Sequence, residues 1–182
     1  MQTLAGFLVL TVAGANIAHG QSAGVNHPAN HAIIPSERLQ VRAAIEPASA
    51  KSGTPIIVKL VSKNVWYNVV TVSDYGADVD YELIVVDSAG KEAPRTAAGE
   101  RLFRGEYVLL RTMPAYLDPG KEIRAEIDAT KIYQLTQPGT YYMWATRDPF
   151  RGSPDEPTPT GDVSKLPIER AFSNPVQFTI VP

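Results

Sequence analysis

The sequence predicts an all-β domain, an antiparallel sandwich of about seven to eight short strands. Three observations predict it. Apolar residues recur with a period of two in several short segments. The 15 Pro and 13 Gly lie mostly between these segments. No segment carries the longer period of an amphipathic helix, and the chain has no Cys, so packing rather than disulfides must stabilise it.

A signal peptide is predicted for residues 1–20. Its uncharged apolar run is too short to span a bilayer but suits a signal-peptide core, and Ala18 and Gly20 suit cleavage after Gly20. No Lys or Arg precedes the run, so an uncleaved N-terminal anchor is the alternative. We expect a secreted or periplasmic protein, with a flexible, Pro-broken leader over residues 21–38.

The folded domain is predicted to span residues 39–182, and eight of its segments have strand patterns. These segments are 39–45, 56–63, 69–73, 81–87, 107–112, 122–128, 140–147 and 176–181. The clearest places Ile123, Ala125 and Ile127 on one face and charged residues on the other, as a half-solvated strand requires. Residues 148–172 are too long for a turn, so we expect a long loop there.

The stretch "LTQPGTYYM" has the spacing of a structural corner. Leu135, Gly139 and Tyr141 resemble the tyrosine corner of immunoglobulin-like sandwiches, in which the Tyr hydroxyl bonds to backbone upstream. In that corner the Tyr stands two residues before a cysteine, and Met143 occupies the cysteine position here. The resemblance therefore implies the corner without the disulfide.

The resemblance extends over most of the predicted domain. The stretches "GTPIIVKLVSKN", "YELIVVDSAGKEAPRT", "LDPGKEIRAEID" and "SNPVQFTIV" resemble a group of exported bacterial immunoglobulin-like domains and, more distantly, the bacterial intracellular-proteinase-inhibitor domain. It implies an immunoglobulin-like antiparallel β-sandwich without a disulfide. The motifs are specific for this fold and say almost nothing about activity.

Several chemistries are excluded by composition. The three His are His19, His27 and His31, all before the predicted domain, so it has no imidazole for a catalytic triad or a zinc site. Nucleotide-binding glycine motifs are missing from the sequence. A net charge of -2 without a basic stripe argues against nucleic acid as a partner. We therefore expect no enzyme.

Two groups of residues are candidate binding sites. Tyr142 and Trp144 alternate onto the face opposite Tyr141, with Arg147 beyond them, and Trp66 belongs to a second aromatic pair. Aromatic residues with Arg are enriched at binding hot spots, and aromatic faces stack on sugars. The alternative is that a long connection covers these side chains.

The stretch "SDYGADVDYE" carries the candidate metal ligands. Asp74, Asp78, Asp80 and Glu82 lie in one inter-strand connection and offer oxygens of the kind that Ca²⁺ prefers, although their spacing matches no EF-hand. A solvated polar loop is the alternative. No other cofactor is expected.

The function expected from these patterns is that of a non-catalytic exported binding or accessory module. It would contact a protein or a glycan at the cell envelope through loops or the aromatic residues. The alternative is a proteinase-inhibitor-like domain that presents the loop at 148–172, and a third possibility is a Ca²⁺-stabilised structural domain.

Overall fold

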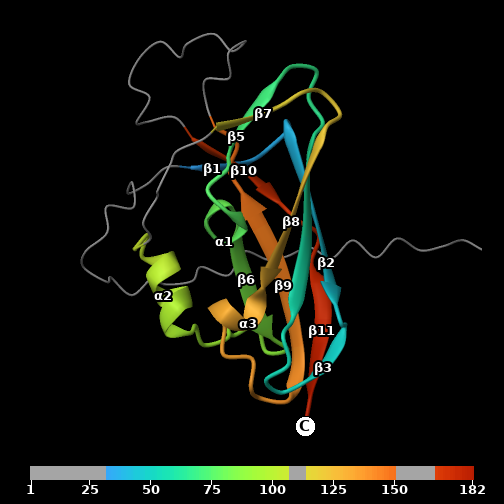
Figure 1. Cartoon of the computed structure of the whole chain (residues 1–182), viewed down its shortest axis with the longest axis vertical. Coiled ribbons are helices and arrows are strands. Elements are labelled where there is room, and N and C mark those ends of the chain that lie inside the picture. The colour runs from blue at the N-terminus through green and yellow to red at the C-terminus, as the bar shows by residue number, and fades with distance from the viewer. Residues whose placement is uncertain (1–31, 107–113, 151–166) are drawn as a thin grey trace, which may run out of the picture.

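The structure, a computed structural model of the chain, describes residues 32–106, 114–150 and 167–182 (Figure 1). These residues form mostly strands with three short helices. The strands are β1 (Ile33–Pro35), β2 (Leu39–Glu46), β3 (Ser49–Lys51), β4 (Ile57–Asn64), β5 (Val70–Ser73), β6 (Glu82–Asp87), β7 (Pro114–Leu117), β8 (Glu122–Asp128), β9 (Gly139–Arg147), β10 (Ile168–Phe172) and β11 (Val176–Val181). The helices are α1 (Ala77–Asp80), α2 (Ala97–Phe103) and α3 (Ala129–Ile132).

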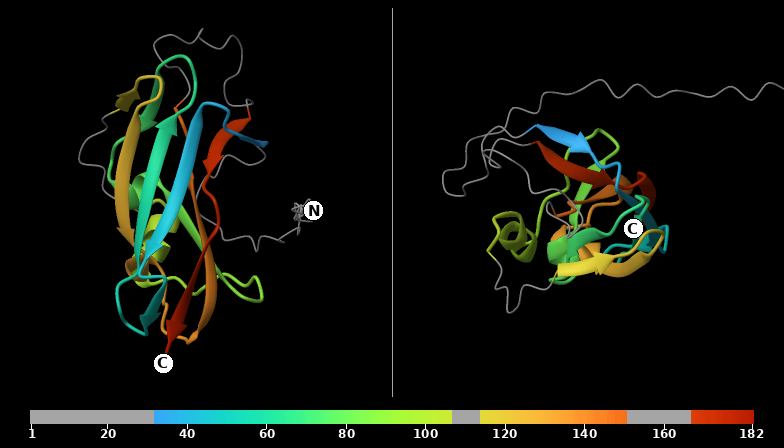
Figure 2. Two further views of the ribbon diagram at one scale, coloured as in Figure 1. Left: turned by 90° about the vertical axis from the view of Figure 1, so that its right-hand side faces the viewer. Right: turned by 90° about the horizontal axis from the view of Figure 1, so that it is seen from above.

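Two sheets pack face to face as a β-sandwich (Figure 2). The larger sheet has the order β1-β10-β9-β11-β3. β10 and β11 pair with successive parts of one edge of β9, and β6 pairs with the opposite edge. The smaller sheet has the order β2-β4-β8, and β5 pairs with β7 separately. β1 runs parallel to β10, and β3 runs parallel to β11, so the sandwich is mixed rather than purely antiparallel as predicted.

The core lies between the inner faces of the two sheets. Along β9, Tyr141, Met143 and Ala145 are buried inward, whereas Tyr142 and Trp144 point to the outer face. β11 faces the core with Phe178 and Ile180, and β4 faces it from the opposite sheet. The period-two patterns of the sequence therefore place the buried face of these strands correctly.

The two sides of the sandwich, where the edges of the two sheets lie next to each other, have different structures. At one side the Asn174 side chain bonds to both backbone groups of Ala43 on β2, and each hydrogen bond is 3.0 Å long. At the other side, β6 and β8 are edge strands, and the three helices lie along this side (Figure 1). α2 packs closely on α3. The backbones are so near that a Cβ atom at Gly99 would lie only 2.1 Å from the Ile132 carbonyl oxygen.

Seven of the eight predicted strands are present, as β2, β4, β5, β6, β8, β9 and β11, and the eighth, 107–112, lies outside the described residues. β1 lies in the predicted flexible leader, so the folded part begins earlier than residue 39. β10 lies inside the predicted long loop, which shortens it. The three helices were not predicted, because helices of four to seven residues are too short to show a helical period.

The predicted signal peptide at 1–20 and most of the leader lie outside the described residues. Residues 151–166 of the predicted loop do so as well. Within the part of the chain that the structure describes, no helix has the length and apolar character needed to cross a membrane.

Candidate functional site

The predicted corner is present at the start of β9. The Tyr141 hydroxyl donates a hydrogen bond of 2.9 Å to the Gln137 carbonyl, four residues upstream. Its ring stacks on Phe178 with the centroids 5.5 Å apart. Leu135, the first residue of the predicted corner, is buried in the core. Burial and then the charge of Asp87 raise the pKa of the Tyr141 hydroxyl. These contacts give Tyr141 a structural role.

The outer face of the larger sheet carries an aromatic surface. Tyr142 and Trp144 of β9 point outward, and their cross-strand neighbours on β6 are Val86 and Ile84. Thr146 follows Tyr142 and Trp144 at two-residue intervals along β9, so it lies on their face of the sheet. Phe172 of β10 pairs with Thr146, and therefore Phe172 lies on this face as well. We name Ile84, Val86, Tyr142, Trp144 and Phe172 the aromatic face.

Exposure differs across the aromatic face. Tyr142 is 38% exposed and Phe172 is 47% exposed, whereas Trp144, Ile84 and Val86 are half-buried. The loop predicted at 148–172 includes Phe172, so the sequence does not place it on this face. The apolar residues in "IERAF" carry at most a weak strand signal, which the preceding Pro-rich residues obscure.

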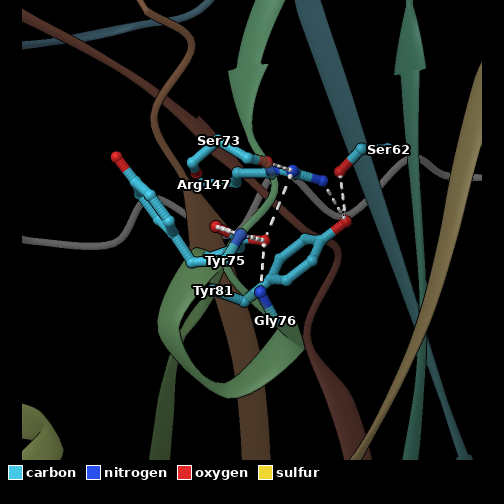
Figure 3. Close-up of polar contacts among 7 residues, drawn as sticks. Ser62, Ser73, Tyr75, Gly76, Tyr81 and Arg147 are labelled. Atoms are coloured by element: carbon cyan, nitrogen blue, oxygen red, sulfur yellow. Dashed lines mark hydrogen bonds and ion pairs between the residues drawn. The ribbon is translucent and has the colours of Figure 1, made fainter. Parts of the chain in front are cut away.

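Arg147 is not part of this surface, which corrects the prediction. Arg147 follows Tyr141, Met143 and Ala145 at two-residue intervals along β9, so its side chain points inward as theirs do. It is only 2% exposed. Its Nη1 donates a hydrogen bond of 2.8 Å to the Tyr81 hydroxyl, and its Nη2 donates to the Ser73 carbonyl (Figure 3). The Tyr81 oxygen lies 2.7 Å from Ser62 Oγ on β4, so the interaction connects the two sheets.

A carboxylate balances the buried guanidinium. Asp80 Oδ2 lies 3.9 Å from Arg147 Nη2, and the Asp80 side chain is 4% exposed. The same carboxylate accepts hydrogen bonds from the backbone N–H groups of Tyr75 and Gly76 (Figure 3). The Arg147 guanidinium also lies 4.7 Å from the centroid of the Tyr81 ring. Arg147 Nε has no hydrogen-bond partner among the described residues.

The four carboxylates predicted as Ca²⁺ ligands are not brought together. Asp80 faces Arg147, and Glu82 forms an ion pair of 3.1 Å with Arg170. Asp74 and Asp78 are exposed. Over residues 32–106, 114–150 and 167–182, no group of three or more acidic, His or Cys side chains is placed to hold a metal ion.

Trp66 lies in the connection between β4 and β5 and is not on a strand of the larger sheet. It is half-buried and packs on the core, with the Arg38 guanidinium 5.5 Å from its ring centroid. Its backbone N–H donates a hydrogen bond of 2.8 Å to the Asn64 side chain. Tyr67 beside it is 77% exposed, so it is the more accessible member of this predicted pair.

Ion pairs hold the two chain segments that flank residues 151–166. Arg170 makes a two-point contact with Asp148, with N–O distances of 2.8 and 3.0 Å. The Phe150 backbone N–H donates a hydrogen bond of 2.8 Å to the Thr71 carbonyl. Next to this pair, Arg38 binds the Glu169 carboxylate. Both flanking segments are therefore attached to the sandwich.

The pKa of Glu169 predicts a dependence of stability on pH. Burial by itself raises this pKa, but hydrogen bonds from Arg38 and Ser36 and the charge of Arg38 outweigh it, so the pKa lies below the usual value of 4.5 for a glutamate. The folded chain therefore holds fewer protons at Glu169 than the unfolded chain. The resulting stabilisation is complete above pH 4.5 and is lost as the pH falls through the lowered pKa.

We expect Glu169→Gln to weaken this dependence. Below pH 4.5, the free energy of unfolding should fall more steeply for the wild-type chain than for the variant. Urea unfolding at several pH values down to about 3 measures both slopes. Parallel curves over this range would contradict the assignment.

Comparison with known proteins gives only distant likenesses. No protein-family model matches the chain, and no curated protein matches it. Among solved structures, the CARDB domain of a Pyrococcus furiosus protein in complex with di-metal ions is 13% identical, with 87% of this chain and 99% of that chain covered at a TM-score of 0.37.

Two further solved structures are similar at the same level. One is a chain of the complex between Zinc 2-glycoprotein and Prolactin inducible protein from human seminal plasma, with 12% identity, 80% and 98% of the two chains covered and a TM-score of 0.37. The other is AvmM, which catalyses macrocyclization in alchivemycin A biosynthesis, with 12% identity, 82% and 91% covered and a TM-score of 0.37.

Proposed function

We propose that this chain is a non-catalytic exported binding or accessory module, which contacts a protein or a glycan at the cell envelope through the aromatic face. The observation that carries the proposal is the outward projection of Tyr142 and Trp144 beside Phe172 on neighbouring strands. Large apolar side chains clustered on one sheet face are typical of interaction sites on monomeric proteins.

We further propose that the sandwich is immunoglobulin-like. The hydrogen bond of Tyr141 to Gln137 supports this assignment, because the same corner occurs in that fold. Support also comes from the division of the strands, with β2, β4 and β8 in one sheet and β6, β9 and β11 in the other.

The chemistry of the face suits a partner with a flat or apolar surface. Tyr and Trp offer large contact areas with little loss of side-chain entropy, and their ring faces stack on sugars and on other aromatic groups. The exposed Gln177, which pairs across the strands with Tyr142, adds a hydrogen-bonding side chain beside the rings. A protein surface and a glycan both meet these requirements.

Trp144→Ala tests the proposal. We expect binding to isolated cell-envelope protein or polysaccharide fractions to fall by at least tenfold, because a central aromatic contact is typically worth more than about 1.4 kcal/mol. The free energy of unfolding should change by no more than about 1–2 kcal/mol, since the ring is half-buried on the outer face. Co-sedimentation and urea unfolding measure the two effects.

Tyr116→Ala is the matched control, because Tyr116 is 59% exposed on β7, away from the larger sheet. We expect it to retain both binding and stability. If Trp144→Ala unfolds the chain, Trp144 belongs to the core and the proposal fails. Equal loss of binding in both variants would point to a general effect of surface aromatic residues rather than to this face.

A second candidate is the proteinase-inhibitor-like domain, which would present residues between 148 and 172. The attachment of both flanking segments favours it, because Arg170 fixes Asp148 and the Phe150 backbone bonds to Thr71. Rigid flanks lower the entropy cost of binding a partner. Assays of serine and metalloproteases with micromolar protein separate the two candidates, since the aromatic face predicts no inhibition.

A further inference from the structure

A cleft of about 260 Å³ lies between α2 and the segment formed by α1 and β6. This cleft is distinct from the aromatic face, since none of the aromatic-face residues lines it. Apolar side chains form its walls, with Leu83 from β6, Leu102 from α2 and Ile132 from α3. The Tyr133 ring adds an aromatic wall.

The walls of the cleft are held by specific contacts. α2 is capped by Thr96, whose hydroxyl accepts a hydrogen bond of 3.0 Å from the Gly99 N–H, and Gly99 lies directly against the Ile132 backbone. Tyr133 donates a hydrogen bond of 2.7 Å to the Leu83 carbonyl, and burial raises its pKa to about 12. The ring of Tyr133 is therefore neutral and fixed between β6 and α3.

Four charged residues line the cleft, and three of them have partners outside it. Arg95 pairs with Glu92 and lies over the Phe103 ring, 3.6 Å from its centroid. Arg104 pairs with Glu106 at 2.9 Å, and Glu82 pairs with Arg170 at 3.1 Å.

The fourth charged residue of the cleft is Asp78. Among the residues that the structure describes, it makes no ion pair. Its neighbour Asp80 faces Arg147, and neither Asp80 nor Asp74 lines the cleft. The uncompensated charge at the cleft is therefore the negative charge of Asp78.

We propose that this cleft binds a small aromatic or apolar amine in its cationic form. The apolar walls take the hydrocarbon part, and the Asp78 carboxylate pairs with the ammonium group. A cavity of about 150 Å³ accommodates benzene, so the larger volume here suits a bicyclic ring such as indole. Apolar walls with one placed charged group are the usual composition of small-molecule sites.

Three probes of one shape and different charge test the proposal on the full chain. Tryptamine is the cation, 3-propylindole is its neutral counterpart, and indole-3-propionate is an anion of similar size. Titration followed by amide ¹H–¹⁵N shifts should give saturable changes at Gly99, Leu102 and Phe103. We expect tryptamine to bind more tightly than indole-3-propionate, because Asp78 attracts the first and repels the second.

Two matched variants isolate the charge. Asp78→Asn should weaken tryptamine binding by about two- to fivefold, as expected for an exposed ion pair, and leave 3-propylindole binding unchanged. Asp74→Asn removes a nearby exposed carboxylate that does not line the cleft, so it should leave both affinities unchanged. Leu102→Trp should abolish binding of all three probes by filling the cleft.

Several results would overturn the proposal. These are an anion that binds as tightly as the cation, equal effects of Asp78→Asn and Asp74→Asn, shifts confined to residues outside the cleft, and no saturable shift at millimolar probe. The two Asp variants change surface side chains, so they remain informative even if Leu102→Trp fails to fold. Trp144→Ala should leave tryptamine binding unchanged, which separates the cleft from the aromatic face.

Discussion

Replacing Arg147 with Met is expected to lower the free energy of unfolding by about 3–5 kcal/mol. The side chain is 2% exposed, and its removal leaves the buried Asp80 carboxylate without its counter-charge. The Tyr81 hydroxyl and the Ser73 carbonyl also lose their donor. Met has a similar length and no charge, so the loss reflects the missing interactions more than an empty volume. Urea unfolding at neutral pH measures it.

Arg124→Met is the matched control, since the Arg124 side chain is 78% exposed and pairs with Glu122 at the surface. We expect a change within about 0.5 kcal/mol. The double variant Arg147→Met with Asp80→Asn should lose less than the sum of the single losses, because both changes break one ion pair. Additive losses, or equal losses for Arg147 and Arg124, would show that the buried pair does not stabilise the sandwich.

Phe178→Ala is expected to lower the free energy of unfolding by about 3–5 kcal/mol. Phe178 is 1% exposed at the centre of β11, and its ring stacks on Tyr141. Truncation therefore removes a fully buried ring and one side of the corner. Calorimetry or urea unfolding measures the loss, and the near-UV circular dichroism should show a changed environment of Tyr141.

Phe172→Ala provides the comparison within the same sheet. Phe172 is 47% exposed on the aromatic face, so its truncation should cost less than about 1 kcal/mol of stability. It should nevertheless weaken the association proposed for that face. A loss of stability equal to that of Phe178→Ala would contradict the placement of Phe172 at the surface.

The longer strands are predictable from sequence because the signal is local. In β8, Ile123, Ala125 and Ile127 alternate with charged residues, and the structure places these three against the core. β1 and β3 have no such signal. Each has three residues, and each exists because a distant strand, β10 or β11, supplies its hydrogen bonds. No local pattern encodes that partner.

The candidate site was predictable only in part, and Arg147 shows why. Its parity along β9 is that of Tyr141 and Met143, so period two alone predicts an inward side chain. Arg is nevertheless usually found at the surface, because an unpaired buried charge is costly. The partner that removes this cost, Asp80, lies in another connection. Because Asp80 and Arg147 are far apart in the sequence, no local pattern predicts that they pair. The cleft between α2 and β6 is also formed by residues from separate segments, so no local pattern predicts it either.

The amide of Asn174 has a consequence for how the protein behaves in concentrated solution. By bonding to the N–H and the carbonyl of Ala43, it occupies positions on the β2 edge that a strand of another molecule would otherwise use. A single side chain between β10 and β11 thus protects the middle of an edge strand from intermolecular pairing. We therefore expect the colloidal stability of the folded chain to depend on a residue that contributes nothing to the hydrophobic core.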